Sequence, residues 1–342
     1  QPFSLDARLR YTPPNYGGDI NLFVEGQRAM NLSGTIGKDR IQAVAYADSL
    51  NLSVLRAFLP NLEGLAGDMS AEMKITGTFK NPQTNGFLNI RNLSLNPPGV
   101  DMPLRNGVVK IAISPTKVSV DTLRVQSRSG AISVSGSIEN IMNGAATGQL
   151  QAEVQKILLQ RKNEFNTLIN NAQFTFSKTG PDDYFLKGRI SLGETRFVDR
   201  ITVDDIIRRI TAPRKPGESP PAFFRKTRLD ITLDGGEKIY IDNNLADIRL
   251  RSELQVAGTL AGPVVLGNVT AVEGKIYYLD REFKIIEGTV EFNDRRQMNY
   301  GVRFLPVTFE RVAHCAILGY VSFDKVEVGM IQKRDNALAA EQ

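Results

Sequence analysis

A strict alternation of apolar and polar side chains is the feature that most constrains how this 342-residue chain can fold. In residues 247–256 the apolar side chains of Ile248, Leu250, Leu254 and Val256 occupy every second position, apart from one serine. The intervening side chains are polar and mostly charged. A β-strand points successive side chains to opposite faces, so this segment predicts a strand with one dry face and one solvated face.

The same alternation recurs along most of the chain. It favours an antiparallel or mixed sheet with one face in water over parallel strands that are buried on both faces. The sequence therefore predicts a mainly β fold, built from a mostly antiparallel sheet with one apolar face. The candidate lining residues of this face are Val109, Ile111, Ile113, Ile132, Val134, Leu229, Ile231, Leu233, Ile248, Leu250, Leu254, Val256, Phe283 and Ile285.

Glycine-containing dipeptides between the apolar runs predict tight hairpin turns. These dipeptides are Gly17-Gly18, Asn106-Gly107, Ser129-Gly130 and Gly235-Gly236. Pro115 also separates two runs and is expected in a turn rather than in a central strand.

A degenerate internal repeat has the pattern apolar-x-Gly-Thr/Ser-apolar. Residues 75–82 and 256–263 are the fullest copies, each continuing to a proline and then a strand led by glycine, and residues 32–36 and 134–138 are partial copies. Repeats of this kind indicate a quasi-linear array rather than a closed globule. The repeated glycine is predicted to permit a bend or bulge. The alternative is that Gly-Thr simply ends ordinary strands.

Helix is expected in only one or two short segments. Residues 202–210 have apolar side chains at helical spacing, with Thr202 as a cap and acidic residues in the first turn. Residues 53–59 are the second candidate, ended by Pro60. Residues 153–168 fit either a helix or a strand. The proline-rich stretch 213–221 is expected to be a loop rather than a domain boundary.

The residue pattern gives no support for catalysis. The single histidine, His314, precedes the single cysteine, Cys315. Neighbours in a strand point to opposite faces, so these two do not form a nucleophile–base pair. One residue of each type excludes a Cys/His metal cluster, and no glycine–lysine phosphate loop occurs. We expect no enzyme, catalytic residue, cofactor or metal site.

Three acidic clusters offer calcium binding as an alternative to that expectation. They are Asp182-Asp183, Asp204-Asp205 and Asp242-Asn243-Asn244. Their simpler interpretations, which we favour, are a turn, the start of a helix and a second turn.

The charge balance is mildly basic, with 42 Lys and Arg residues against 37 Asp and Glu residues. No basic stripe with interleaved aromatic side chains appears, so nucleic-acid binding is not expected. The densest basic cluster includes Arg208, Arg209, Arg214 and Lys215. These side chains either contact lipid phosphates at the mouth of a groove or, as the favoured interpretation, belong to a helix end and a solvated loop.

Residues 229–292 resemble a known family. The segments that carry the resemblance, in order, are LDITL (229–233), IYIDN (239–243), LQVAGT (254–259), Pro263, GNV (267–269), EGKIYY (273–278) and FKIIEGTVEF (283–292). Their order and spacing resemble the C-terminal domain of the TamB family, the inner-membrane component of the translocation and assembly module of diderm bacteria. The repeat upstream, in residues 65–86, is similar to the AsmA-like repeats of the same superfamily.

The resemblance implies an elongated, curved β-taco or half-pipe that is open along one side and lined by apolar residues. It also implies a periplasmic location and an inner-membrane anchor, which would lie outside these residues because they contain no apolar run of about twenty. The implied partners are phospholipids and an outer-membrane barrel of the TamA or BamA kind. The implied role is phospholipid movement to the outer membrane, or help with outer-membrane protein assembly and secretion, with the candidate lining residues shielding acyl chains.

The resemblance divides the chain into three segments. Residues 1–228 are expected to be an AsmA-like groove segment, continuous with a TamB C-terminal-like segment in residues 229–299. Residues 300–342 depart from the family pattern, which a truncated or shifted reading frame would explain. Barrel binding, which the family assigns to its C-terminal end, is therefore not carried over to this tail.

Two other classes of protein compete with the lipid groove. A structural or adhesive β-solenoid would have a closed, dry core and evenly spaced rungs, whereas the repeat copies here lie at uneven intervals. A polysaccharide-active β-helix enzyme would gather acidic residues on one face, and no such cluster is apparent.

Overall fold

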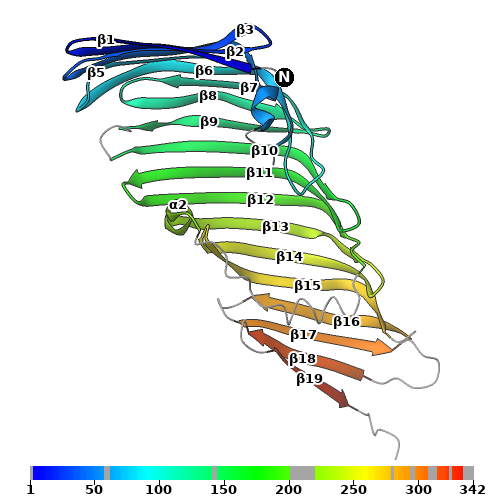
Figure 1. The fold of residues 1–342 in the computed structure, drawn as a ribbon. Helices are drawn as coiled ribbons and strands as arrows, with labels where there is room; N and C mark the ends of the chain where they lie inside the picture. Colours follow the sequence, from blue (N-terminus) through cyan, green and yellow to red (C-terminus); the bar gives the residue numbers. More distant parts are fainter. Residues whose placement is uncertain are drawn as a thin grey trace, which may run out of the picture. The chain divides into compact units, whose positions relative to one another are not determined.

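The computed structural model describes residues 3–57, 62–140, 145–200, 220–278, 281–292, 297–306, 314–322 and 326–333. These residues form nineteen β-strands and two short helices (Figure 1). They divide into two compact units. Unit one comprises Gln1–Ile157 and Gln173–Tyr184, and unit two comprises Leu158–Ala172 and Phe185–Gln342.

Unit one is an antiparallel meander in which each strand pairs with the next one along the chain, from β1 to β10. A 3-10 helix, η1 (Leu52–Ala57), follows β4. The strands are β1 (Phe3–Thr12), β2 (Asn15–Val24), β3 (Gln27–Ile36), β4 (Arg40–Asn51), β5 (Glu63–Thr78), β6 (Asn81–Asn96), β7 (Leu104–Ile113), β8 (Lys117–Gln126), β9 (Ala131–Glu139) and β10 (Thr147–Arg161).

Unit two repeats this plan, with antiparallel pairs between successive strands from β13 to β19. Its one described helix is α2 (Ala222–Lys226). Strands β10, β11 (Phe165–Gly180) and β12 (Asp183–Phe197) contribute residues to both units. The remaining strands are β13 (Thr227–Asp242), β14 (Ala246–Thr259), β15 (Gly262–Tyr278), β16 (Arg281–Phe292), β17 (Gln297–Pro306), β18 (His314–Ser322) and β19 (Val326–Lys333).

The predicted fold class, a mainly β and antiparallel architecture with very little helix, is confirmed. The helix predicted in residues 53–59 is the 3-10 helix η1, and the ambiguous residues 153–168 are the β10–β11 hairpin. The helix predicted in residues 202–210 lies outside the described residues, as does most of the loop at 213–221. No helix in the described part of the chain combines the length and apolarity that a membrane crossing requires.

The glycine-containing dipeptides were only partly correct as turn predictions. Ser129-Gly130 forms a turn, closed by a 2.8 Å hydrogen bond from the Ser127 amide to the Gly130 carbonyl, and Pro115 lies in the β7–β8 turn. The other three turn predictions were wrong, because those dipeptides lie inside strands: Gly17-Gly18 in β2, Asn106-Gly107 in β7 and Gly235-Gly236 in β13.

Local backbone geometry explains two of these three errors. Register shifts flank Asn106-Gly107 and Gly235-Gly236, and Asn106 and Gly236 have φ angles of 54° and 50°. A β-bulge favours glycine and asparagine for the same reason that a turn does, because both accept a left-handed backbone. The same dipeptide therefore fits either structure.

The internal repeat encodes a hairpin corner. In the two fullest copies the repeated glycine has a positive φ, 103° at Gly77 and 86° at Gly258, and pairs directly with the later proline. The following threonine closes the turn: Thr78 Oγ1 accepts a hydrogen bond from the Asn81 amide at 3.1 Å. Thr259 Oγ1 does the same for the Gly262 amide at 3.2 Å. No register shift occurs at either glycine, so neither forms a bulge. Gly-Thr ends β5 and β14 in these two copies, as the alternative interpretation has it.

We expect the threonine hydroxyl to stabilise this corner. Thr78→Val keeps the side-chain shape but removes the Oγ1 acceptor of the Asn81 amide, and it should lower the free energy of unfolding by about 1 kcal/mol. Urea unfolding followed by circular dichroism measures the change. Thr78→Ser retains the hydroxyl and serves as the control; equal losses in the two variants would contradict the assignment.

Candidate functional site

The apolar face of unit one is continuous across its strands. Directly opposed residues of an antiparallel pair project to the same face, so rows of cross-strand partners define what that face carries. One such row, read from β2 to β8, is Leu22, Met30, Ala47, Ala71, Leu88, Ile111 and Val120.

The register brings the predicted lining residues of unit one together on this face. Ile111 lies between Leu88 and Val120, and Ile113 opposes Val118. Val109 opposes Leu123, which in turn opposes Val134, while Ile132 opposes Val125. Between Val120 and Leu123, β8 has one residue more than the paired stretch of β9. This bulge keeps the apolar side chains before and after it on the same face of the sheet.

The predicted lining residues of unit two also share one face. Ile231 opposes Val256 and Leu233 opposes Leu254, while Ile248 and Leu250 lie across from Ile241 and Ile239. Phe283 opposes Ile276 in β15. Leu229 and Ile285 lie two residues from Ile231 and Phe283 along their strands, which places them on the same face. Lipid contact by any of these residues stays a prediction.

Much of this apolar surface is only half-buried. Of the predicted lining residues, Val109, Leu229 and Ile285 are buried, and the others retain partial exposure. In unit one the exposure reaches 82% at Leu9 and 60% at Tyr16. Exposed apolar area costs about 25 cal/mol per Å², so a contiguous surface of this kind indicates a binding partner.

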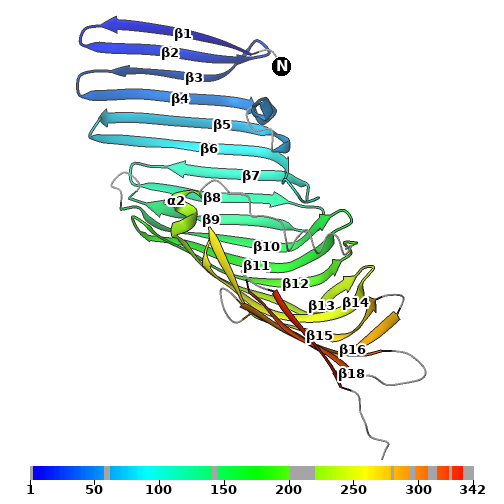
Figure 2. The same ribbon diagram turned by 60° about the horizontal axis from the view of Figure 1, so that its bottom comes forward.

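The exposure in unit one is graded from one end of the strands to the other. We call the end with the β2–β3, β4–β5, β6–β7 and β8–β9 turns the covered margin; η1 lies there, beside the end of β4 (Figure 2). Side chains buried near it are Ala29, Leu50, Leu52, Leu65, Leu104 and Val125. Part of this group is a core in which Ala29, Ala47 and Leu50 pack with Val54 of η1.

The opposite end, with the β1–β2, β3–β4, β5–β6 and β7–β8 turns, is the open margin. Large apolar side chains exposed near it are Leu9, Tyr11, Tyr16, Ile36 and Phe79. Leu5 and Met30 are exposed nearer the covered margin, so the gradient is a tendency along the strands rather than a sharp border. The face is therefore accessible mainly from one side.

A trench crosses the strands just inside the open margin. Gly18, Gly34 and Ala43 are opposed to one another on β2, β3 and β4, and they form a row of minimal side chains. The outer neighbouring row carries Tyr16, Ile36 and Ile41, and the inner row carries Ile20 and Leu32. The trench between them has a volume of about 230 Å³.

Sequence reasoning missed this trench. Its signal was the partial repeat copy at residues 32–36, where Gly34 occupies a position that the alternation reserves for an apolar side chain. A side chain at Gly34 is excluded, because its Cβ would lie 2.6 Å from the Gln42 carbonyl oxygen.

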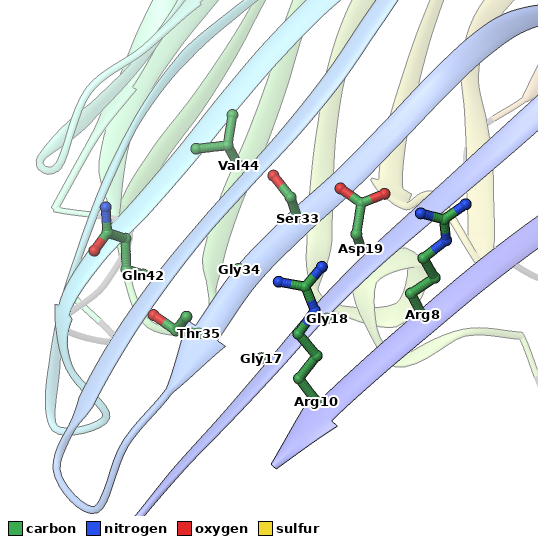
Figure 3. A pocket seen from close by; sticks show the side chains of 10 residues that line it. All are labelled: Arg8, Arg10, Gly17, Gly18, Asp19, Ser33, Gly34, Thr35, Gln42 and Val44. Carbon is green, nitrogen blue, oxygen red and sulfur yellow. The ribbon is translucent and has the colours of Figure 1, made fainter. Parts of the chain in front are cut away.

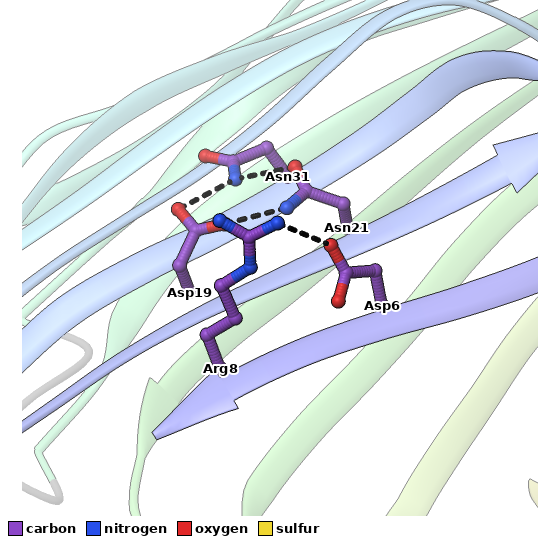
Figure 4. Close-up of polar contacts among 5 residues, drawn as sticks. All are labelled: Asp6, Arg8, Asp19, Asn21 and Asn31. Carbon is purple, nitrogen blue, oxygen red and sulfur yellow. Dashed lines mark hydrogen bonds and ion pairs between the residues drawn. The ribbon is translucent and has the colours of Figure 1, made fainter. Parts of the chain in front are cut away.

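The polar face of unit one has a different character. Asp19 accepts hydrogen bonds from Asn21 at 2.5 Å and Asn31 at 3.2 Å, and Arg8 pairs with Asp6 at 3.5 Å (Figure 4). A depression of about 630 Å³ on this face is lined by polar side chains that include Arg8, Arg10, Asp19, Ser33 and Gln42 (Figure 3). It lies on the side opposite the predicted lining residues.

Ion pairs cover the polar face of unit two. Arg249 contacts Glu237 at 3.7 Å and Glu273 at 3.1 Å, and Arg251 also pairs with Glu237. Lys275 pairs with Glu282 at 2.7 Å, and this hydrogen bond raises the pKa of the lysine. Exposed pairs contribute little to stability, so we regard them as a solvated surface rather than a catalytic arrangement.

The remaining predicted sites divide into two groups. Arg208, Arg209, Arg214, Lys215 and the Asp204-Asp205 pair lie outside the described residues. The other two acidic clusters are turns: Asp182-Asp183 connects β11 to β12, and Asn243 Oδ1 accepts hydrogen bonds from the amides of Leu245 and Ala246. Across the described ranges, no three Asp, Glu, His or Cys side chains are grouped as a metal site would require.

Comparison with known proteins gives two matches. The family profile described as the TamB C-terminal domain matches residues 121–299, which is 179 of the 342 residues. The translocation and assembly module subunit TamB of Haemophilus influenzae is 19% identical over 298 residues, an alignment that covers 80% of this chain. The chain spans 22% of the length of that relative.

Ser252 interrupts the apolar face of unit two and yields a prediction about stability. It is 1% exposed, and its Oγ has no hydrogen-bond partner among the described residues. Ser252→Ala removes a buried, unsatisfied hydroxyl and should raise the free energy of unfolding by about 1 kcal/mol, measured by urea denaturation. Ser135→Ala, at an exposed position of β9, should change it little; a loss of stability in Ser252→Ala would show that the hydroxyl is satisfied.

Proposed function

Because this chain belongs to the TamB family, whose C-terminal domain profile matches more than half of it, we propose that it acts in assembly of the bacterial outer membrane. Within that role, its apolar face shields the acyl chains of phospholipids in transit. The observation that carries the proposal is the half-buried apolar face itself, which is continuous over successive strands within unit one.

The chemistry of the two faces supports a lipid rather than a soluble ligand. An acyl chain lying on the apolar face removes hydrocarbon area from water on both partners, while the lipid headgroup stays solvated at a margin. The opposite face is charged and hydrogen-bonded, which keeps it in water. A continuous face of this kind suits a series of chains better than a single small molecule, whose pocket would be closed on most sides.

The antiparallel pairing of the strands does not favour the two competing classes, a structural or adhesive β-solenoid and a β-helix enzyme. A β-solenoid and a β-helix enzyme both coil their chain so that successive rungs stack in parallel, whereas every strand pair described here is antiparallel. A non-enzymatic role also agrees with the family.

The setting of this activity is proposed from the relative. Its name places the Haemophilus influenzae protein in a translocation and assembly module, and this chain covers only 22% of its length. We infer a longer protein with an inner-membrane anchor elsewhere, a periplasmic location for this part and an outer-membrane barrel of the TamA or BamA kind as partner. Arg208, Arg209, Arg214 and Lys215 stay candidates for headgroup contact.

A carboxylate placed on either face tests the proposal. Val256→Asp adds a charge to the apolar face, where an ion loses its hydration without gaining a partner, and should reduce retained phospholipid several-fold. Thr232→Asp is the matched control, since Thr232 opposes Gln255, the chain neighbour of Val256, and is exposed on the polar face. Lipid extraction and mass spectrometry measure retention, and circular dichroism checks folding. Equal retention in both variants would refute the face assignment.

A further inference from the structure

The open margin of unit one carries unpaired positive charge. Lys38 is exposed in the β3–β4 turn beside Asp39, Arg40 is exposed as the first residue of β4, and Lys80 is exposed in the next turn of the same margin. Within the described ranges none of these three cations forms an ion pair. At the β7–β8 turn, which is the next one along this margin, the charge of Lys117 is neutralised by an ion pair with Glu139 at 3.4 Å.

The covered margin has no such excess. Its turns and strand ends mix acids with arginines, and some of these are already engaged. Asp101 pairs with Arg128 at 3.7 Å, and Arg56 Nε donates a hydrogen bond to the Leu65 carbonyl at 2.7 Å. The excess of positive charge therefore lies at the margin where the apolar face is also most exposed.

The β3–β4 turn, which carries Lys38, adjoins the trench directly. Ile36 and Ile41, which line the trench, oppose each other at the base of this turn. A 2.8 Å hydrogen bond from the Gly37 amide to the Arg40 carbonyl closes the turn immediately beyond them. Lys38 lies in this turn, two residues beyond Ile36, whereas Arg40 alternates with Ile41 in β4 and therefore points to the polar face.

Two tyrosines mark the same boundary. Tyr11 and Tyr16 oppose each other in β1 and β2, their ring centroids are 4.7 Å apart, and Tyr16 is in turn opposite Ile36. Tyrosine is typical of boundaries between apolar and aqueous surroundings, because its ring is apolar and its hydroxyl is polar. From the inside of the face outwards, the order is therefore the apolar trench, then the tyrosine pair, then the turn that carries Lys38.

We propose that this part of the open margin is a phospholipid subsite, with an acyl chain in the trench and the headgroup phosphate at Lys38. The inference rests on the proposed function and adds to it a position, an orientation and a preference for anionic lipid. The trench crosses three strands that are spaced about 4.8 Å apart, so it holds a segment of one chain rather than a whole lipid. The rest of the lipid lies on the neighbouring apolar rows.

Two variants test the acyl-chain contact and the headgroup contact independently. Lys38→Gln removes the cation. Gly18→Val fills the trench floor: its Cβ would meet only the flexible Leu9 Cδ2 at 3.1 Å and the Arg8 carbonyl oxygen at 3.7 Å. The matched controls are Lys74→Gln, which removes an exposed cation of the polar face, and Gly17→Val, the adjacent glycine facing the other side.

The experiment measures the affinity of the full chain for fluorescent phosphatidylglycerol and for the uncharged diacylglycerol with the same acyl chains. The cation variant should bind phosphatidylglycerol about five-fold more weakly and should bind diacylglycerol unchanged. Gly18→Val should weaken both lipids. Neither control should weaken either lipid.

The outcomes separate this inference from the proposed function. Unchanged phosphatidylglycerol binding by the cation variant, or equal losses in Gly17→Val and Gly18→Val, would overturn the subsite while lipid binding itself stands. If the unsubstituted chain bound neither lipid, both proposals would fail.

Discussion

A broad apolar surface on a sheet that is one layer thick is the constraint on which the rest of the structure depends. An ordinary domain buries such a surface beneath a second layer of helices or strands. In the described part of unit one, only η1 packs onto the sheet, and it covers one margin. The uncovered remainder determines what the chain can do, because water is an unfavourable neighbour for it and acyl chains are a favourable one.

The charged face and the hairpin corners follow from the same constraint. A single layer exposes its second face fully, and that face must be polar for the protein to stay in solution. A short corner cannot fold back over the apolar face, and the β5–β6 and β14–β15 connections are corners of this kind. The Gly-Thr corners at residues 77–82 and 258–263 combine a left-handed glycine and a threonine hydroxyl.

The sequence was most informative where the side-chain period is regular. In β14 the alternation predicted the strand and both of its faces, and the register pairs Val256 with Ile231 as that pattern requires. It failed at Gly17-Gly18 and Asn106-Gly107, because a glycine or asparagine inside a strand has the same local signature as one in a turn. Helix η1 was anticipated in residues 53–59, before Pro60, although its 3-10 geometry was not.

Only part of the candidate site could be predicted from the alternation of apolar and polar side chains. Lining residues between Val109 and Ile285 follow from alternation, since each projects a side chain. The trench is made by side chains that are missing at Gly18 and Gly34, and a missing side chain leaves no apolar signal. The open and covered margins could not be predicted from the sequence either, because they depend on which turns fall at the same end of the strands. That question requires the complete order of pairing.

This order has a consequence for how such a chain can change its length. Successive strands of a meander run in opposite directions, so inserting a whole hairpin leaves every later turn at its original margin. Inserting or deleting one strand would instead exchange the two margins for all later turns, carrying cationic corners to the side that η1 covers. We therefore expect relatives of different length to differ by an even number of strands, because strands would be gained and lost in pairs.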